Sequence, residues 1–472
     1  MAAISSLGIG SGMDLNALVS QLVALERKPL QQMQSEASKL QNKVSLFGQM
    51  KSLMSSLQDA ANKLAGSTLW SQTKALSSNP AAVSVSSATG SLAGSYQVSV
   101  QTLAAAQSVV GTATFSDSSA LVGAGTLSIE LGSWDAGATA FTAKAGGSVV
   151  DIAVTDTDTL ATLRDKINAS DAGVTASIVT DANGSRLSIR SKTTGAENGF
   201  RVGVADNDGN PTDAAGLSRF AYDPPTGQSQ MLRSQAATNA LATVNGISVS
   251  SATNSLDNVI EGLSIKVQQV TTANVDLTVS TDTEAITEAV NAFAKAYSSL
   301  AAFIKDQTKY DDASKKGSPL QGDSTATGLL NQMRAVLNSP SGASAAFPRL
   351  SDIGLRLQAD GSMLVDSAKL TTAMGNLTEL RKAFSNHDEA DASNNGFAKR
   401  YALLATGVLG TDGSLTTRTD SLQKLIKDNQ AKQDRLNDRV VLFEKRLITQ
   451  YAAMDAQMAK FNALSGYLTQ QL

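Results

Sequence analysis

Apolar residues recur at helical spacing near both ends of this chain, and that spacing most constrains what the chain can fold into. At steps of three and four residues, side chains share one helix face and can form the seam of a coiled coil. A striped terminal helix needs something to cover it, so we expect these residues to serve oligomerisation or docking. The N-terminal stripe consists of Leu15, Leu18, Leu22 and Leu25, and the C-terminal stripe of Leu436, Val440, Phe443, Leu447, Met454, Met458, Phe461 and Leu468.

The segment between the two ends changes to a period of two, which is typical of β-strands. Asn183 and Gly184 lie between two such runs and predict a tight hairpin. A short helix is expected around Leu256–Ile260. The helical period returns behind Thr281 and Glu284, whose spacing is that of a capping box. The striped helix that follows is expected to be intramolecular core.

Two further features refine the expected elements. Leu160, Leu163 and Ile167 predict one short amphipathic helix among the strands. Pro29 lacks a backbone donor and is expected to kink or restart the first helix. No other proline occurs before Pro80, so residues 30–67 can form one long helix.

The order of helix, sheet and helix predicts an α+β multidomain protein, in which both chain ends form a helical coiled-coil or bundle stalk with inserted β-rich head domains. A chain of 472 residues is long enough for several domains. The expected parts are a terminal leg at 1–42 and 430–472, a helical bundle at 43–75 and 283–429, a β-rich head domain at 76–104 and 238–282, and an outer β-rich domain inserted at 105–237.

Composition excludes several classes of site. Cysteine is absent and His387 is the only histidine, which removes thiolate catalysis, cysteine-based metal sites and the usual nucleophile–base pairs. His387 lies in a polar run and is expected to be a solvated loop residue. The acidic run from Asp206 to Asp213 places Gly209 fourth, whereas an EF-hand loop needs its glycine sixth. We therefore predict no catalytic, cofactor-binding or metal site.

Charge and hydropathy exclude two classes of partner. The net charge of −3 gives no basic footprint for nucleic acid, and no stretch has the apolar length of a membrane span. The opening MAAISSLGIGSGMD lacks the basic start and apolar run of a cleavable signal. Its glycines, Gly8, Gly10 and Gly12, indicate a flexible leader.

Several segments resemble the bacterial flagellar filament capping proteins, also called the hook-associated protein 2 family. The resemblance begins at SSLGIGSGMDLNALVSQLVALERKPL and continues through AGSYQVSVQTLAAAQ, VNGISVSSATNSLDNVIEGL, GDSTATGLLNQMR and LSDIGLRLQADGSMLVDSAKL. It closes with DRVVLFEKRLITQYAAMDAQMAKFNALSGYLTQQL. These segments follow the family's order across nearly the whole chain, and residues 105–237 match least closely.

This resemblance implies a structural, non-enzymatic cap at the tip of the flagellar filament, commonly of five copies, under which exported flagellin folds and inserts. It implies secretion by the flagellar type III apparatus, docking of the terminal helices on the filament, and flagellin, hook–filament junction proteins and an export chaperone as partners. In some relatives the head adheres to host surfaces such as mucin, which this sequence leaves open. The alternatives are another flagellar axial component, either flagellin-like or a hook–filament junction protein, and a muramidase-type enzyme with a carboxylate pair in the head.

Overall fold

The computed structural model describes residue 12, residues 14–313 and residues 315–471. Two of the leader glycines, Gly8 and Gly10, lie outside these described residues. The chain forms two compact units, one of Met1–Trp70 with Thr283–Leu472 and the other of Ser71–Asp282. The first is the helical unit and the second is the β unit.

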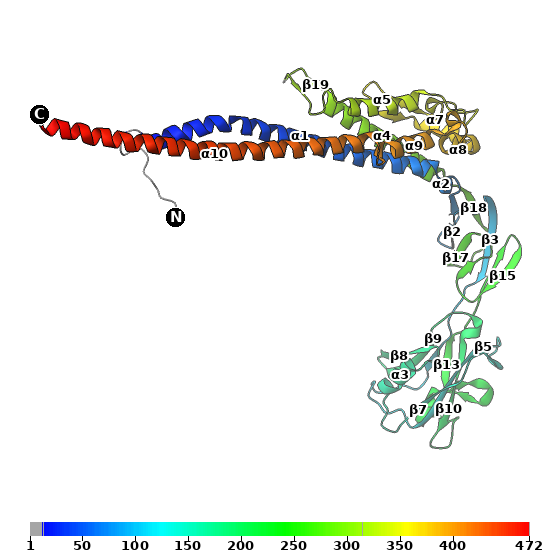
Figure 1. Ribbon diagram of the computed structural model, residues 1–472. Helices are drawn as coiled ribbons and strands as arrows, with labels where there is room; N and C mark the ends of the chain where they lie inside the picture. The colour runs from blue at the N-terminus through cyan, green and yellow to red at the C-terminus, as the bar shows by residue number, and fades with distance from the viewer. Residues whose placement is uncertain (1–11, 13, 314, 472) are drawn as a thin grey trace. The chain divides into compact units, whose positions relative to one another are not determined.

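The helical unit contains two long helices and a set of shorter ones. Figure 1 shows the long helices, α1 (Leu15–Ala65) and α10 (Ser414–Gln471), running alongside each other in opposite directions. The shorter helices are α2 (Ser67–Trp70), α4 (Thr283–Thr308), α5 (Ser324–Asn338), α6 (Leu350–Ile353), α7 (Ser367–Met374), α8 (Leu377–Ser385) and α9 (Phe397–Leu409). Two small hairpins join them, β19 (Tyr310–Asp311) with β20 (Lys316–Gly317) and β21 (Leu355–Leu357) with β22 (Met363–Val365).

Helix α1 begins after a capping aspartate, Asp14, and continues through its proline. The Asp14 carboxylate accepts a 2.9 Å hydrogen bond from the backbone N–H of Ala17, which satisfies a free donor of the first turn. Pro29 neither ends nor restarts the helix, contrary to one of the two expected outcomes. Leu25 and Pro29 lie on an exposed face of the helix. Water can therefore hydrate the Leu25 carbonyl, which receives no hydrogen bond from the proline nitrogen.

The core of the helical unit joins α1 to helices encoded more than two hundred residues later. Phe47 and Met54 of α1 are fully buried in one cluster with Phe293 of α4 and Tyr401 of α9. The rings of Phe293 and Tyr401 meet edge to face at 5.2 Å, and the Tyr401 hydroxyl donates a 2.6 Å bond to the carbonyl of Met333. The striped helix α4 is therefore intramolecular core, as its spacing predicted.

The β unit has two hydrophobic cores. One lies between a five-stranded sheet, in the order β1-β18-β3-β14-β15, and a three-stranded sheet, β16-β17-β2. We call this the flanking β domain; its strands are β1 (Thr73–Ser77), β2 (Val83–Ser87), β3 (Gly94–Thr102), β14 (Ala240–Val244), β15 (Ile247–Ser251), β16 (Ser255–Asp257), β17 (Leu263–Val267) and β18 (Val275–Thr281). Strands β1 and β18 are hydrogen-bonded neighbours, so the chain enters and leaves the β unit side by side.

The other core belongs to the inserted β domain, which comprises a six-stranded sheet, a four-stranded sheet and helix α3. The larger sheet runs β12-β11-β10-β5-β6, with β7 also paired to β5, and the smaller runs β13-β4-β9-β8. The elements are β4 (Ser108–Gly111), β5 (Gly125–Trp134), β6 (Phe141–Ala143), β7 (Val150–Val154), α3 (Leu160–Ala169), β8 (Val174–Asp181), β9 (Gly184–Ser191), β10 (Gly199–Asp206), β11 (Tyr222–Asp223), β12 (Gln228–Ser229) and β13 (Met231–Gln235).

The hairpin prediction is confirmed, with a shift of one residue in its loop. Strands β8 and β9 pair up to Asp181 and Gly184, so Ala182 and Asn183 form the connection. Gly184 is the first residue of β9 and has a φ of +121°, a value that favours glycine.

Two local predictions are wrong. The segment expected to be a helix around Leu256–Ile260 contains strand β16, in which Leu256 pairs with Ile265. The Asp257 carboxylate accepts bonds from Ser255 and Ser264, which favours the extended pairing over a helix. Thr281 is the last residue of β18 and pairs with Thr73, so it does not cap α4, which begins at Thr283.

The predicted helix α3 is present and its start is capped reciprocally. Leu160, Leu163 and Ile167 are fully buried in the core of the inserted β domain. The Thr159 hydroxyl accepts from the backbone N–H of Thr162, and the Thr162 hydroxyl accepts from the N–H of Thr159. This capping box satisfies donors that an uncapped helix leaves free.

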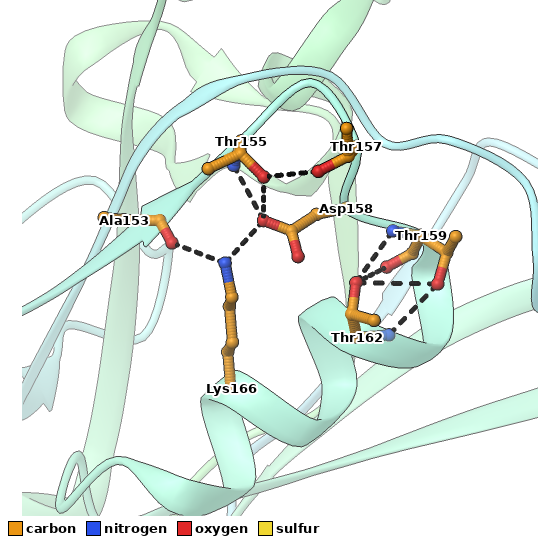
Figure 2. Close-up of polar contacts among 7 residues, drawn as sticks. All are labelled: Ala153, Thr155, Thr157, Asp158, Thr159, Thr162 and Lys166. Atoms are coloured by element: carbon orange, nitrogen blue, oxygen red, sulfur yellow. Dashed lines mark hydrogen bonds and ion pairs between the residues drawn. The ribbon is translucent and has the colours of Figure 1, made fainter.

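A buried carboxylate ties α3 to the strand before it (Figure 2). The side chain of Asp158 is 8% exposed and accepts bonds from the Thr155 N–H at 2.7 Å and from Lys166 Nζ at 2.5 Å. Lys166 of α3 also donates to the Ala153 carbonyl of β7 at 3.0 Å. Burial acts to raise the pKa of Asp158, but the bonds from Lys166 and Thr155 outweigh it and hold that pKa far below its ordinary value.

We predict that Asp158→Asn lowers the free energy of unfolding of the β unit by about 1–3 kcal/mol at pH 7, because it removes the buried carboxylate that accepts from both Thr155 and the partly exposed Lys166. A carboxylate with a lowered pKa stabilises the folded state fully above its ordinary value of 3.8 and loses that effect as pH falls below it. In urea titrations, the difference between wild type and variant should therefore shrink between pH 4 and 2. Asp156→Asn, at an exposed neighbour, is the control, and an equal loss in both variants would refute the argument.

Residues 71–282 should fold when expressed alone, because their strands and both of their cores lie within that range. Circular dichroism should give a β-type spectrum, and thermal unfolding should be cooperative. A coil-like spectrum with a gradual melt would show that the β unit depends on the helical unit.

Candidate assembly surface

The polar residues considered as candidate catalytic or metal-binding groups make local contacts within the fold. His387 is exposed, and its Nδ1 lies 3.2 Å from Asn395 Oδ1. Across residues 12, 14–313 and 315–471, no group of three or more His, Cys, Asp or Glu side chains is placed to hold a metal ion. In the same part of the chain, no helix combines the length and apolar character needed to cross a membrane.

The acidic run at residues 206–213 closes turns. Asp206 accepts a 2.8 Å bond from the N–H of Ser218, and Asp208 accepts one of the same length from the N–H of Asn210. Burial acts to raise the pKa of Asp206, but the backbone bonds from Ser218 and Asp208 dominate and lower it. These carboxylates accept bonds from the backbone, so the run forms turns.

The apolar stripes of the two terminal helices meet in an antiparallel seam. Val19 and Val23 of α1 form a buried cluster with Leu436, Val440 and Leu447 of α10. Full burial of such a side chain stabilises the pair by about 1.5–3 kcal/mol. Each terminal helix therefore covers part of the other.

Two ion pairs flank this seam. Arg439 Nη2 lies 2.7 Å from Glu26 Oε1, and Arg27 Nη2 lies 3.8 Å from Glu444 Oε2. Their side chains are 36–65% exposed, so each pair adds little stability. They do show the register, because Glu26 is level with Arg439.

The twelve residues predicted for docking separate into buried, half-buried and exposed groups. Leu15, Leu436, Val440 and Leu447 are buried within the chain, and Leu22 and Phe443 are half-buried beside the seam. The remaining six are exposed: Leu18, Leu25, Met454, Met458, Phe461 and Leu468. Of the buried four, Leu436, Val440 and Leu447 belong to the intramolecular seam, and the six exposed residues stay uncovered within the described part of the chain.

The last part of α10 carries a row of exposed apolar side chains. Phe461 and Leu468 are 66% and 56% exposed, and Leu464 between them is 59% exposed. Phe461 and Leu464 line a shallow groove with Gln457 and Lys460. A continuous exposed apolar row is typical of an interaction site, whereas single exposed leucines are ordinary.

Spacing alone missed members of the buried seam and of the exposed row. Val19 and Val23 form the α1 side of the seam, although the predicted stripe followed the leucines beside them. Leu464 lies three residues after Phe461 and extends the exposed row, so the same spacing rule could have found it.

Family models and relatives account for almost the entire chain. Models described as the flagellar hook-associated protein 2 N-terminus and C-terminus match residues 11–107 and 237–463, and the flagellin hook IN motif matches residues 140–193. The chain is 31% identical to flagellar hook-associated protein 2 of Escherichia coli K12, over 100% of this chain and 98% of that protein. It is also 31% identical to the B-type protein of Pseudomonas aeruginosa, over 98% and 96% of the two chains.

A solved structure gives the same result. The crystal structure of the flagellar cap protein FliD domains D1-D2-D3 from Escherichia coli matches with a TM-score of 0.56 and 28% identity. The match covers 80% of this chain and 99% of that one. The chain therefore belongs to the flagellar hook-associated protein 2 family.

Proposed function

We propose that this chain is a structural cap at the distal end of the bacterial flagellar filament, where it promotes folding and insertion of exported flagellin and prevents its loss. Likeness over full length to flagellar hook-associated protein 2 supports this proposal. The observation that carries the mechanism is the exposed apolar row on α10, which has no covering helix among the described residues.

In this proposal the terminal helices dock on the filament. A helix with an apolar face binds by laying that face into a groove between other helices. Covering Phe461 or Leu464 would remove an exposed apolar side chain from water and stabilise the docked state by about 1.5–3 kcal/mol each. Leu18 and Leu25 supply a second exposed pair on α1, one heptad apart.

The proposed partners are further copies of this chain, with five as the expected number, together with flagellin, hook–filament junction proteins and an export chaperone. Secretion through the flagellar export apparatus to the filament tip belongs to the same proposal. We propose no catalytic role, since Asp206 accepts bonds in a turn, Asp158 pairs with Lys166, and His387 is an exposed residue beside Asn395.

Phe461→Asp should abolish capping while leaving both units folded, because a charge on the exposed row cannot be buried in a groove without a large desolvation cost. Filaments seen by electron microscopy should be short or absent, and immunoblots should show flagellin monomer in the medium. Ala456→Asp is the matched control, since it places the same charge on an exposed alanine of α10 outside the apolar row. Filaments of normal length from the Phe461 variant would exclude this row as the docking surface.

The purified chain should self-associate at micromolar concentration, since a cap is built from several copies. Sedimentation velocity should show species larger than a monomer, and a chain ending at residue 453 should show fewer of them. A full-length chain that stays monomeric at high concentration would count against the cap.

A further inference from the structure

Two amide side chains interrupt the apolar seam of α10. The positions that face the seam follow alternating steps of three and four residues. They run Leu422, Ile426, Asn429, Gln433, Leu436 and Val440. Asn429 and Gln433 are each only 7% exposed, and Gln433 Nε2 donates a 2.6 Å hydrogen bond to Asn429 Oδ1. The pair thus satisfies part of its own hydrogen bonding inside the seam.

This amide pair lies between two separate hydrophobic clusters. Leu422 belongs to the core of the helical unit, whereas Leu436 belongs to the terminal cluster with Val19 and Val23. No buried apolar residue of α10 lies between them, and Ile426 is half-buried. Apolar burial along the seam is therefore weakest at Asn429 and Gln433.

Helix α1 is equally weak at the same level. Met33 packs on the terminal cluster and Leu40 on the core of the helical unit. Between them only Ala37 is half-buried, and its neighbours are exposed polar residues. Ala37 lies eleven residues beyond Glu26 and Asn429 ten before Arg439, so the ion pair of Glu26 and Arg439 places the alanine opposite the amide pair.

A buried polar layer in a coiled coil commonly fixes register, but here the register is already fixed. Phe47 and Met54 anchor α1, and Leu415 and Leu422 anchor α10, in one core. Neither helix can slide without breaking that core. The effect that remains for the amide pair is on the coupling between the two clusters, because regions with few buried apolar contacts open locally at low free energy.

We propose that Asn429, Gln433 and the facing Ala37 form a break in the seam, which lets the terminal helix pair open while the helical core stays folded. Opening uncovers the apolar faces centred on Val19 and Val440, and the core holds both helices in the chain. This device goes beyond the proposed cap function and does not depend on it.

Native-state hydrogen exchange on the full chain tests the break. In the wild type, amides of residues 17–33 should exchange at least tenfold faster than those of residues 47–64. Replacing the pair, Asn429→Leu with Gln433→Leu, should slow exchange at residues 17–33 at least tenfold and bring it toward the core, because leucines join the two clusters. The matched control is Gln423→Leu with Asn437→Leu, which changes the same residue types at exposed positions of α10 and should leave the two rates apart.

A second variant keeps the test decisive if the leucine pair disturbs folding. Val440→Asn extends the polar layer into the terminal cluster, so exchange at residues 17–33 should speed up at least tenfold with no change at residues 47–64. Equal wild-type rates in the two regions would overturn the proposal. So would a leucine pair that folds but slows the terminal amides no more than its control does.

Discussion

The helical unit depends on the contact of α1 with helices from the far end of the chain. Phe47, Met50 and Met54 are fully buried, and the residues around them come from α4, α9 and α10. Deleting one such side chain from a packed core costs about 2–5 kcal/mol, a large share of the stability of any domain. Because α4, α9 and α10 follow the β unit in the sequence, this core can form only after the β unit has been synthesised.

A polar contact supports this core from its edge. Asp323 caps α5 by accepting bonds from the N–H groups of Thr325 and Ala326, and its other oxygen accepts a 2.7 Å bond from Arg418 of α10. The side chain of Asp323 is 2% exposed and that of Arg418 is 34% exposed, so the arginine reaches from the surface to a buried acceptor. One carboxylate thereby joins the start of a short helix to the longest helix of the chain.

Periodicity predicted the long helices, α3, the alternation of the β unit and the hairpin at Asn183, because each depends on local spacing. It did not predict which side of a stripe is covered. Leu18 and Val19 are adjacent and both apolar, yet the first is 39% and the second 6% exposed, a difference set by the α10 side chains opposite. Likewise, local spacing predicts a helix around Leu256 and misses the strand, because the pairing of Leu256 with Ile265 is a tertiary contact that no local pattern contains. The exposed row around Phe461 follows from the same spacing that predicts the helix.

The pairing of β1 with β18 has a consequence for how such proteins diversify. Thr73 and Thr281 are directly paired, so the two ends of the β unit lie on adjacent strands. A module with neighbouring attachment points can be exchanged for another, shortened or decorated with new loops without altering the frame that carries it. Recombination at this junction would exchange the β unit while the helical unit stays under separate selection.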